Sequence, residues 1–385
     1  MKKLMPFLSY VLVAVAAVCM TLSIQSIGSR QESTKLDELR ALIDNVYVGQ
    51  VDEKALEDGA AAGMVAGLGD RWSRYMDRET YAEYVEQMNN SYVGVGITVQ
   101  LNEDGVVLVL RVEEGGPADE AGMEPGDLIV AVDGQDVRGY TIDDIKNMVR
   151  GDEGTTVDLT LDRSGSNMTL KVERRLVETA VVRYELLDDG IGLITIINFD
   201  SRCAEETIAA IEDLRSQGAD KLLFDVRNNP GGYKHELVAL LDYLLPEGPL
   251  FRSVDYTGKE AVDMSDASCL ELPMAVLMNG DSYSAAEFFA AALREYGVAT
   301  LVGQNTTGKG RFQSTYVLSD GSAATISVGT YCTPNGVDLT DVGLTPDISV
   351  EVDDETYLKI YYGQVPAAED PQIRAAVAAL LEKTP

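Results

Sequence analysis

The sequence from residue 275 to residue 297 is AVLMNGDSYSAAEFFAAALREYG, and TGKGRFQ follows at residues 307–313. The apolar run over 275–278 breaks at Asn279–Gly280, and a helical pattern then begins at 282–284 and ends at the last glycine of the stretch. This order predicts a strand, a sharp turn and a helix. A serine in such a turn lies where free N–H groups and the helix dipole favour a developing negative charge, as acyl transfer requires.

The candidate nucleophiles are Ser282 and Ser284, and the candidate base is Lys309, which lies between two glycines. A lysine acts as a base only when it is neutral, so its pKa must fall from about 10.4 through burial away from carboxylates. Gln313 offers an uncharged amide that would hold the amine without stabilising its charge. His235 is the only histidine of the chain, and a Ser–His pair is the competing chemistry.

A glycine-rich turn offers donors for an oxyanion. An apolar strand predicted over 221–226 leads into RNNPGG at 227–232, and backbone N–H groups in such a turn face outward without obstruction by side chains. We expect Gly231 or Gly232 to supply one donor and Ala285 to supply the other. The sequence leaves both glycines open.

Residues 91–175 follow a different pattern. Predicted strands and a helix alternate there with glycine-rich turns: strands over 92–99, 105–110, 156–161 and 168–172, a helix over 141–149, and the segments GPA at 116–118 and PGDLI at 125–129. This order resembles a PDZ domain of the bacterial protease-associated type. The glycines of VGVG, Gly94 and Gly96 on either side of Val95, let backbone N–H groups converge on a peptide's terminal carboxylate, and the strand from Ile97 can pair with that peptide.

The remainder of the chain reads as a layered α/β core followed by a helical tail. The predicted elements are strands over 190–199, 221–226, 275–278 and 298–302, helices over 204–217, 234–245 and 284–296, and a hairpin of 311–318 with 323–332. Residues 173–189 are expected to connect the two domains. A last helix over 371–383 is expected to pack on the N-terminal arm or on a second subunit.

The N-terminal residues have a membrane pattern. Residues 4–27 carry no charged side chain and follow Lys2 and Lys3, so they could cross a bilayer with the lysines inside. We expect a retained anchor, with a cleaved signal peptide as the alternative. A lipoprotein at Cys19 is disfavoured because Val18 stands where a small residue is needed. Residues 31–90 read as helices that form a packing or self-association arm, through which a homodimer could form.

Composition excludes several classes of function. The net charge of −32 argues against a nucleic-acid partner. Cys203, Cys269 and Cys332 are widely spaced and odd in number, so they indicate neither a disulfide framework nor a zinc site. No His-Glu-x-x-His pattern occurs. We therefore expect no metal and no cofactor.

The motifs RNNPGG, NGDSYSAAE at 279–287 and TGKGRFQ together closely resemble those of the C-terminal processing (tail-specific) serine peptidases, over about residues 35–350. The resemblance implies a ClpP/crotonase-like core with an inserted PDZ domain, in which Ser284 is the nucleophile, Lys309 the general base and Gln313 its support. Only Ser284 has the spacing from Lys309 that the family shows, so we expect Ser282 to be a helix cap. Tyr283 is bulkier than the family's usual residue and could reshape the adjoining pocket.

These observations predict the organisation of the chain: an anchor or signal segment over 1–29, a helical arm over 30–90, a PDZ domain over 91–175, a protease core over 176–350 and a helical tail over 351–385. The expected function is that of a bacterial, single-pass, extracytoplasmic endopeptidase that cleaves protein substrates near their C-termini. By the resemblance, the PDZ domain binds the substrate's apolar C-terminus and gates the site, with Arg150 as the candidate for the coupling.

Two other classes of function remain open. A PDZ scaffold on a core that no longer cuts would have no need of a buried lysine. A crotonase-type acyl-CoA enzyme shares the oxyanion geometry but fits an extracytoplasmic PDZ protein poorly.

Overall fold

The computed structural model describes residues 34–102 and 104–382, and the chain divides into two compact units, Met1–Met64 and Val65–Pro385. The expected anchor over 1–29 lies outside the described residues. Within the described ranges, no helix is both long and apolar enough to span a bilayer. The arm expected over 30–90 is shared between the units, because β1 (Arg74–Met76) and α4 (Arg78–Met88) belong to the second.

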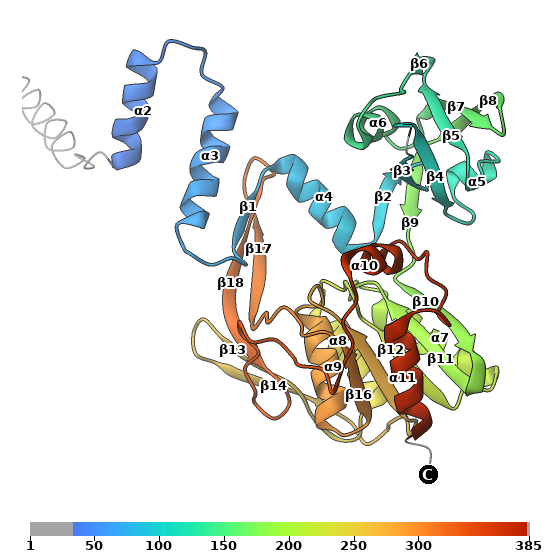
Figure 1. Cartoon of the computed structure of the whole chain (residues 1–385). Helices are drawn as coiled ribbons and strands as arrows, with labels where there is room; N and C mark the ends of the chain where they lie inside the picture. The colour runs from blue at the N-terminus through green and yellow to red at the C-terminus, as the bar shows by residue number, and fades with distance from the viewer. Residues whose placement is uncertain (1–33, 103, 383–385) are drawn as a thin grey trace, which may run out of the picture. The chain divides into compact units, whose positions relative to one another are not determined.

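The helices α2 (Lys35–Val46) and α3 (Glu53–Ala66) account for most of the described part of the first unit, and α3 ends two residues beyond its boundary (Figure 1). A capping box starts α2, because the Thr34 side chain accepts the N–H of Asp37 while the Asp37 carboxylate accepts the N–H of Thr34. Neither helix buries a residue, and Leu36, Leu39 and Leu42 are each at least half exposed. The homodimer expected through this arm stays a prediction.

The predicted PDZ domain is an antiparallel sheet around its own apolar core. Its strand order is β3-β4-β5-β7-β8, with β6 paired to β5 and the helices α5 and α6 beside it. The bounds are β3 (Ile97–Leu101), β4 (Val107–Val112), α5 (Pro117–Glu120), β5 (Leu128–Val132), β6 (Gln135–Asp136), α6 (Ile142–Val149), β7 (Thr156–Arg163) and β8 (Ser166–Glu173). Alternate residues of β7 (Val157, Leu159 and Leu161) are fully buried, which is the period that a one-sided sheet requires.

Two expectations at the edges of this domain were wrong. The strand predicted over 92–99 is two strands, because Gly96 at φ 78° turns the chain from β2 (Ser91–Gly94), which pairs with β9 (Arg175–Glu178), into β3. The predicted connection over 173–189 carries β9 and also β10 (Val182–Leu187), which pairs antiparallel with the core strand β11 (Ile191–Ile196).

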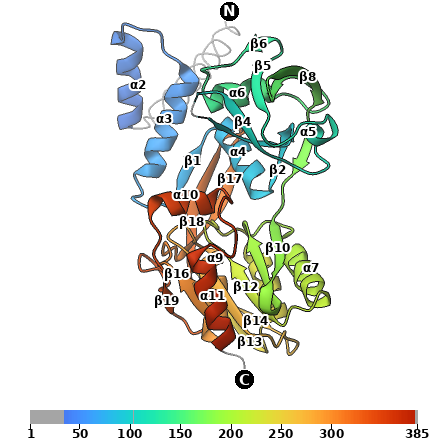
Figure 2. The same cartoon turned by 45° about the vertical axis from the view of Figure 1, so that its right-hand side comes forward.

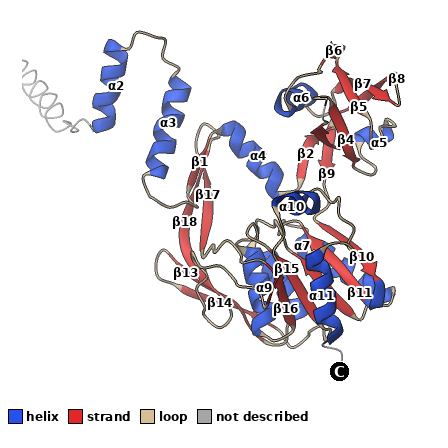
Figure 3. Cartoon of the chain, in the orientation of Figure 1, coloured by secondary structure: helices blue, strands red, loops and turns tan. Residues whose placement is uncertain are grey.

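The predicted protease core is a six-stranded sheet with helices on both faces (Figures 1 and 3). Its order is β10-β11-β12-β15-β16-β19, and every pair after the first is parallel. The remaining strands are β12 (Lys221–Asp225), β15 (Met274–Met278), β16 (Ala299–Gly303) and β19 (Ile348–Ser349), and the helices are α7 (Cys203–Ser216), α8 (Lys234–Leu244), α9 (Ala285–Glu295) and α11 (Pro371–Glu382).

Alternate side chains of each central strand enter two separate apolar cores. Val276 and Met278 pack with α7, α8 and α9, whereas Ala275 and Leu277 pack with Ile373 and the rest of α11. A parallel sheet must be covered on both faces, and α11 supplies the second cover. The expectation that this helix packs on the arm or on another subunit was therefore wrong.

A second sheet packs beside the core, where β13 and β14 contact the helices α8 and α9. Its order is β1-β18-β13-β14, and β17 also pairs with β18 (Figure 2). The predicted hairpin is confirmed as β17 (Arg311–Val317) and β18 (Ala323–Cys332). The hairpin of β13 (Gly248–Asp255) and β14 (Glu260–Ser265), the short β1, and α10 (Asp354–Tyr361) were not predicted.

Candidate active site

The turn that joins β15 to α9 presents Ser284 in a strained conformation. Ser284 has φ 59° and ψ −126°, which is unfavourable for a residue with a Cβ and is typical of a nucleophile held on a sharp strand-to-helix turn. Ser282 is fully buried; its Oγ accepts the N–H of Asn279 at 3.0 Å and donates to the Val226 carbonyl at 2.7 Å. The expectation that Ser282 caps the helix was wrong, because its hydroxyl points back beneath the turn and Ser284 is the N-cap.

The buried carboxylate of Glu287 joins the serine turn to the lysine loop. Its Oε2 accepts the N–H groups of Ser284 at 3.0 Å and Lys309 at 2.9 Å. Its Oε1 accepts the N–H of Gly308 at 2.7 Å and the hydroxyl of Thr306. Burial raises the pKa of Glu287, and these four donors oppose that rise by stabilising the carboxylate. Sequence reasoning missed this role, although a glutamate three residues after a helix N-cap is the signal of a capping box.

Lys309 is half-buried among aromatic rings. Its Nζ lies 5.0 Å from the ring centre of Trp72 and 5.6 Å from that of Tyr283. Burial lowers the pKa of Lys309 to about 8, and the nearby charge of Arg74 adds to the effect. Trp72, in the segment between α3 and β1, is therefore part of the site.

The side chain of Ser284 contacts Tyr331 and not Lys309. Its Oγ is 3.0 Å from the hydroxyl of Tyr331 on β18, and Tyr331 is buried against the rings of Phe251, Phe288 and Phe312. Among the described residues, no hydrogen bond joins Ser284 to Lys309. Ser284 and Lys309 therefore line the same cleft but are not in hydrogen-bond contact.

Gln313 lines the same cleft without reaching the lysine. Its Nε2 donates to the carbonyl of Arg311 and to the hydroxyl of Ser327, both at 3.0 Å. The strand register shifts between Phe312 and Gln313, and this bulge changes the direction of the side chains that follow it. Support of Lys309 by Gln313 stays a prediction.

The glycine turn packs directly on the serine turn. A Cβ on Gly231 would lie 2.7 Å from the Cβ of Ser284 and 2.8 Å from the nitrogen of Ala285, so only glycine permits this approach. The Gly231 N–H donates to Asn229 Oδ1 at 2.8 Å. The N–H groups of Gly232 and Ala285 have no hydrogen-bond partner among the described residues. Of the two glycines, Gly232 is thus the one with a free donor.

His235 does not belong to this arrangement. Its side chain is 69% exposed, it stacks on Tyr233 with ring centres 5.3 Å apart, and its Nε2 lies 3.4 Å from Glu236 Oε1. It is not among the described residues that line the cleft. The geometry therefore gives no support to a Ser–His pair.

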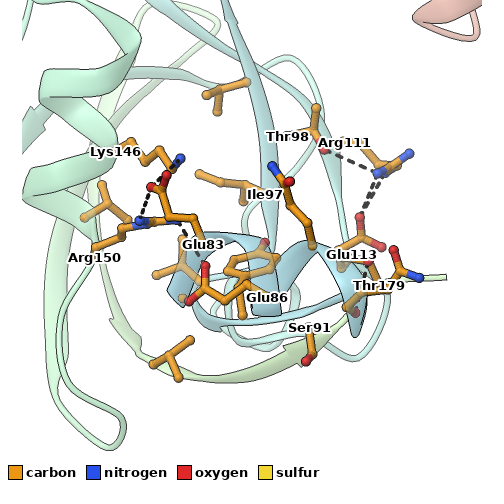
Figure 4. Close-up of a pocket in the computed structure, with 18 of the residues that line it drawn as sticks. Glu83, Glu86, Ser91, Ile97, Thr98, Arg111, Glu113, Lys146, Arg150 and Thr179 are labelled. Atoms are coloured by element: carbon orange, nitrogen blue, oxygen red, sulfur yellow. Dashed lines mark hydrogen bonds and ion pairs between the residues drawn. The ribbon is translucent and has the colours of Figure 1, made fainter. Parts of the chain in front are cut away.

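Two cavities meet in the second unit. The cleft that contains Ser284 has a volume of about 1080 Å³. A groove of about 620 Å³ on the PDZ domain is lined by Gly94, Val95 and Ile97 and by apolar residues of α6 (Figure 4). Gln87, Asn198 and Pro230 line both cavities.

The end of the groove that is expected to bind a carboxylate is occupied by a side chain of the chain itself. The Tyr92 ring packs against Gly94, and its hydroxyl lies near the backbone N–H groups of Ile97 and Gly96. Burial raises the pKa of Tyr92, whereas those two N–H groups act in the opposite direction. The backbone N–H groups that are expected to bind a peptide carboxylate thus point at the hydroxyl oxygen of Tyr92.

Arg150 connects the PDZ helix to α4. It donates to Glu83 Oε1 at 2.9 Å and to Glu86 Oε2 at 3.2 Å, beside a longer contact of 3.7 Å between Lys146 and Glu83 (Figure 4). Other residues of α4, among them Tyr84 and Met88, line the catalytic cleft. One short helix therefore contacts both cavities.

Comparison with known proteins identifies the group to which this site belongs. Residues 190–350 match the model of peptidase family S41, residues 108–163 match the PDZ domain, and residues 16–80 match the activating protease CtpB N-terminal domain. The carboxy-terminal processing protease CtpA of Bacillus subtilis (strain 168) is 32% identical over 374 residues, which cover 94% of this chain and 80% of that protein. The chain belongs to peptidase family S41. It is a serine-type peptidase of the carboxy-terminal processing group.

Two further proteins of the same family resemble this S41 peptidase. A probable CtpA-like serine protease of Staphylococcus haemolyticus (strain JCSC1435) is 31% identical over 325 residues, which cover 83% of this chain and 65% of that protein. The crystal structure of a putative S41 protease from Bacteroides fragilis superposes with a TM-score of 0.61 at 17% identity, over 88% of this chain and 94% of that one. The second likeness shows the fold alone, while the matches over 190–350 and 108–163 show the S41 core and the PDZ domain.

Proposed function

We propose that this S41 peptidase is a membrane-anchored, extracytoplasmic endopeptidase that uses Ser284 as its nucleophile and Lys309 as its general base. One observation carries the proposal: the Glu287 carboxylate fixes, through backbone N–H groups, both a strained serine and a lysine whose pKa burial lowers to about 8. A lysine with such a pKa is neutral often enough to accept a proton near neutral pH.

In the proposed reaction, Ser284 Oγ attacks the scissile carbonyl carbon while the neutral Lys309 amine takes its proton. The oxyanion that forms accepts hydrogen bonds from the free N–H groups of Gly232 and Ala285. The Lys309 ammonium then gives the proton to the leaving amine, and the C–N bond breaks. Water attacks the acyl ester with the same base, which releases the acid and restores the serine.

The structure is a resting arrangement for this reaction. Lys309 must leave the rings of Trp72 and Tyr283, which favour its charged form, and Ser284 must exchange Tyr331 for the amine. We propose that substrate binding at the PDZ groove drives this change. The shared lining residues Gln87, Asn198 and Pro230 offer a path from one cavity to the other, and Arg150 links the groove to α4 through Glu83 and Glu86.

The rate of cleavage should rise with pH. Because the base acts in its neutral form, log(kcat/KM) should climb with a slope near one below the pKa of Lys309, which is about 8, and level off above it. The charge of Arg74 lowers that pKa, so Arg74→Gln should move the rising limb to higher pH. Initial rates on one peptide across the pH range measure both. A limb centred near pH 6.5 that disappears in His235→Ala would contradict the lysine base.

Substrate recognition can be tested at the PDZ groove. A carboxylate placed by Ile97→Asp beside the expected position of the substrate's terminal carboxylate should repel it, raising KM about tenfold for a protein with an apolar C-terminus and changing kcat little. Met168→Asp, on the outer strand β8, is the matched control, because Met168 is 37% exposed and lines neither cavity. Products are mapped by mass spectrometry. Equal KM values for the two variants would contradict recognition at this groove. If neither the variants nor the wild type cleaved the substrate, a PDZ scaffold without peptidase activity would be favoured.

The membrane location rests on the sequence. Residues 4–27 carry no charge and follow two lysines, a pattern that orients the remaining chain outside the cytoplasm. The matches to carboxy-terminal processing proteases give the cleavage position near substrate C-termini as the corresponding expectation. The reaction proposed here requires no metal and no cofactor.

A further inference from the structure

The catalytic cleft is basic, although the chain is strongly acidic. The whole sequence has 63 Asp and Glu against 31 Lys and Arg. Among the described residues that line the cleft this ratio is inverted: the cations are Arg71, Arg74, Lys234, Lys259 and Lys309, and the carboxylate is Asp255. Basic residues are therefore concentrated where the substrate's backbone must lie.

Most of these cations have no carboxylate of their own. In the described part of the chain, no ion pair is formed by Arg71, Arg74 or Lys259, and all three are exposed. Arg71 and Arg74 lie over the rings of Trp72 and Tyr84, at 4.3 Å and 4.8 Å from the ring centres. Stacking of this kind orients a guanidinium and leaves its N–H donors available.

The one carboxylate of the cleft is already occupied. Asp255 accepts the N–H groups of Thr257 at 2.8 Å and Lys259 at 3.1 Å, together with the Thr257 hydroxyl. The PDZ groove differs in this respect, because Arg150 and Lys146 contact Glu83, and Arg111 contacts Glu113 at 2.9 Å. Unpaired positive charge is thus a property of the catalytic cleft and not of the neighbouring groove.

We infer that the cleft selects substrates whose segment before the apolar C-terminus is rich in aspartate and glutamate. This inference rests on the proposed function, since it assigns that segment to the cleft while the C-terminus occupies the PDZ groove. Carboxylates in the segment would pair with Arg71, whose Nη2 has only a long 3.5 Å contact with the Thr307 carbonyl, and with Lys259, which forms no ion pair among the described residues. The chain carries a net charge of −32 and so on balance repels such a segment, whereas the cations of the cleft attract it.

The placement of these groups fits a recognition role better than a structural one. Arg71 precedes β1, and Lys259 follows the turn between β13 and β14, so the two come from separate elements that converge on the cleft. Neither contributes to a buried network. Exposed cations in a cleft raise the rate of encounter with an anionic ligand, and salt screens this effect because the Debye length falls to about 3 Å at 1 M ionic strength.

The test compares two tailed substrates with the full chain purified in detergent. A carrier protein carries a flexible tail with one apolar C-terminus, preceded either by four glutamates or by four glutamines. We expect kcat/KM to be about tenfold higher for the glutamate tail at low salt, with the preference falling to about twofold at 0.5 M NaCl. Arg71→Gln and Lys259→Gln should each reduce the preference about two- to threefold, and together they should remove most of it.

Lys171→Gln is the matched control, because Lys171 is an exposed cation on the outer PDZ strand β8 and lines neither cavity. It should leave the preference unchanged. The glutamine tail reports whether each variant is still folded and active. Equal kcat/KM for the two tails, or a preference that survives the double variant, would overturn the inference while leaving the proposed function intact. Cleavage of neither tail by the wild type would overturn the proposed function, and this inference with it.

Discussion

Replacing Lys309 with methionine, or Ser284 with alanine, is expected to lower kcat/KM by about 10⁴-fold or more while the chain stays folded. Methionine keeps most of the length of the lysine side chain, so contact with Trp72 and Tyr283 persists while the base is lost. Alanine removes the attacking oxygen and its contact with Tyr331. Cleavage of a protein with an apolar C-terminus measures the loss, and thermal unfolding checks the fold.

The double variant separates a dyad from two independent contributions. Groups that act as one unit give non-additive losses, so Ser284→Ala combined with Lys309→Met should be no slower than the worse of the two single variants. His235→Ala should retain wild-type activity, because that side chain is largely exposed and lies outside the cleft. Activity of Lys309→Met within tenfold of wild type would show that another group takes the serine proton.

The local parts of this site could be predicted from the sequence, because they depend on near neighbours. The strand, turn and helix around Ser284 follow from an apolar run, an Asn-Gly break and helical periodicity. The hairpin of β17 and β18 follows from alternation around a Ser-Asp-Gly turn. By contrast, β13 and β14 have few buried positions, so their apolar alternation is weak.

The partners of the proposed catalytic groups could not be predicted in this way. Trp72 and Tyr331 reach Lys309 and Ser284 from segments far away in the chain, and only tertiary packing brings them there. Gln313 is the opposite case, because the sequence suggests a contact with Lys309 that the structure does not contain. It is close to Lys309 in sequence, yet a bulge in β17 directs its amide to Ser327. Motif spacing indicates which residues a site contains, whereas register and packing decide which of them touch.

Glu287→Gln should impair catalysis even though this side chain contacts no substrate. Each carboxylate oxygen accepts two donors: the N–H groups of Ser284 and Lys309 at Oε2, and the Gly308 N–H with the Thr306 hydroxyl at Oε1. The amide nitrogen of glutamine is a donor, so in one orientation it faces the N–H groups of Ser284 and Lys309 and in the other the N–H of Gly308. We expect a loss of about 3 kcal/mol in unfolding free energy and a fall of about 10²-fold in kcat, with KM nearly unchanged.

A second buried glutamate provides the control that distinguishes a positioning role from a merely structural one. Glu236 on α8 is 9% exposed and accepts the N–H of Ala204 at 2.8 Å, which a glutamine oxygen can still accept. Glu236→Gln should therefore change kcat less than about twofold. Thr306→Val removes one donor and leaves the three N–H contacts, so its kcat should fall between the two. If Glu287→Gln lowered stability as expected but left kcat intact, Glu287 would stabilise the fold without setting the distance between the serine and the lysine. A graded fall in kcat across Glu236→Gln, Thr306→Val and Glu287→Gln is the result that a carboxylate connecting nucleophile and base requires.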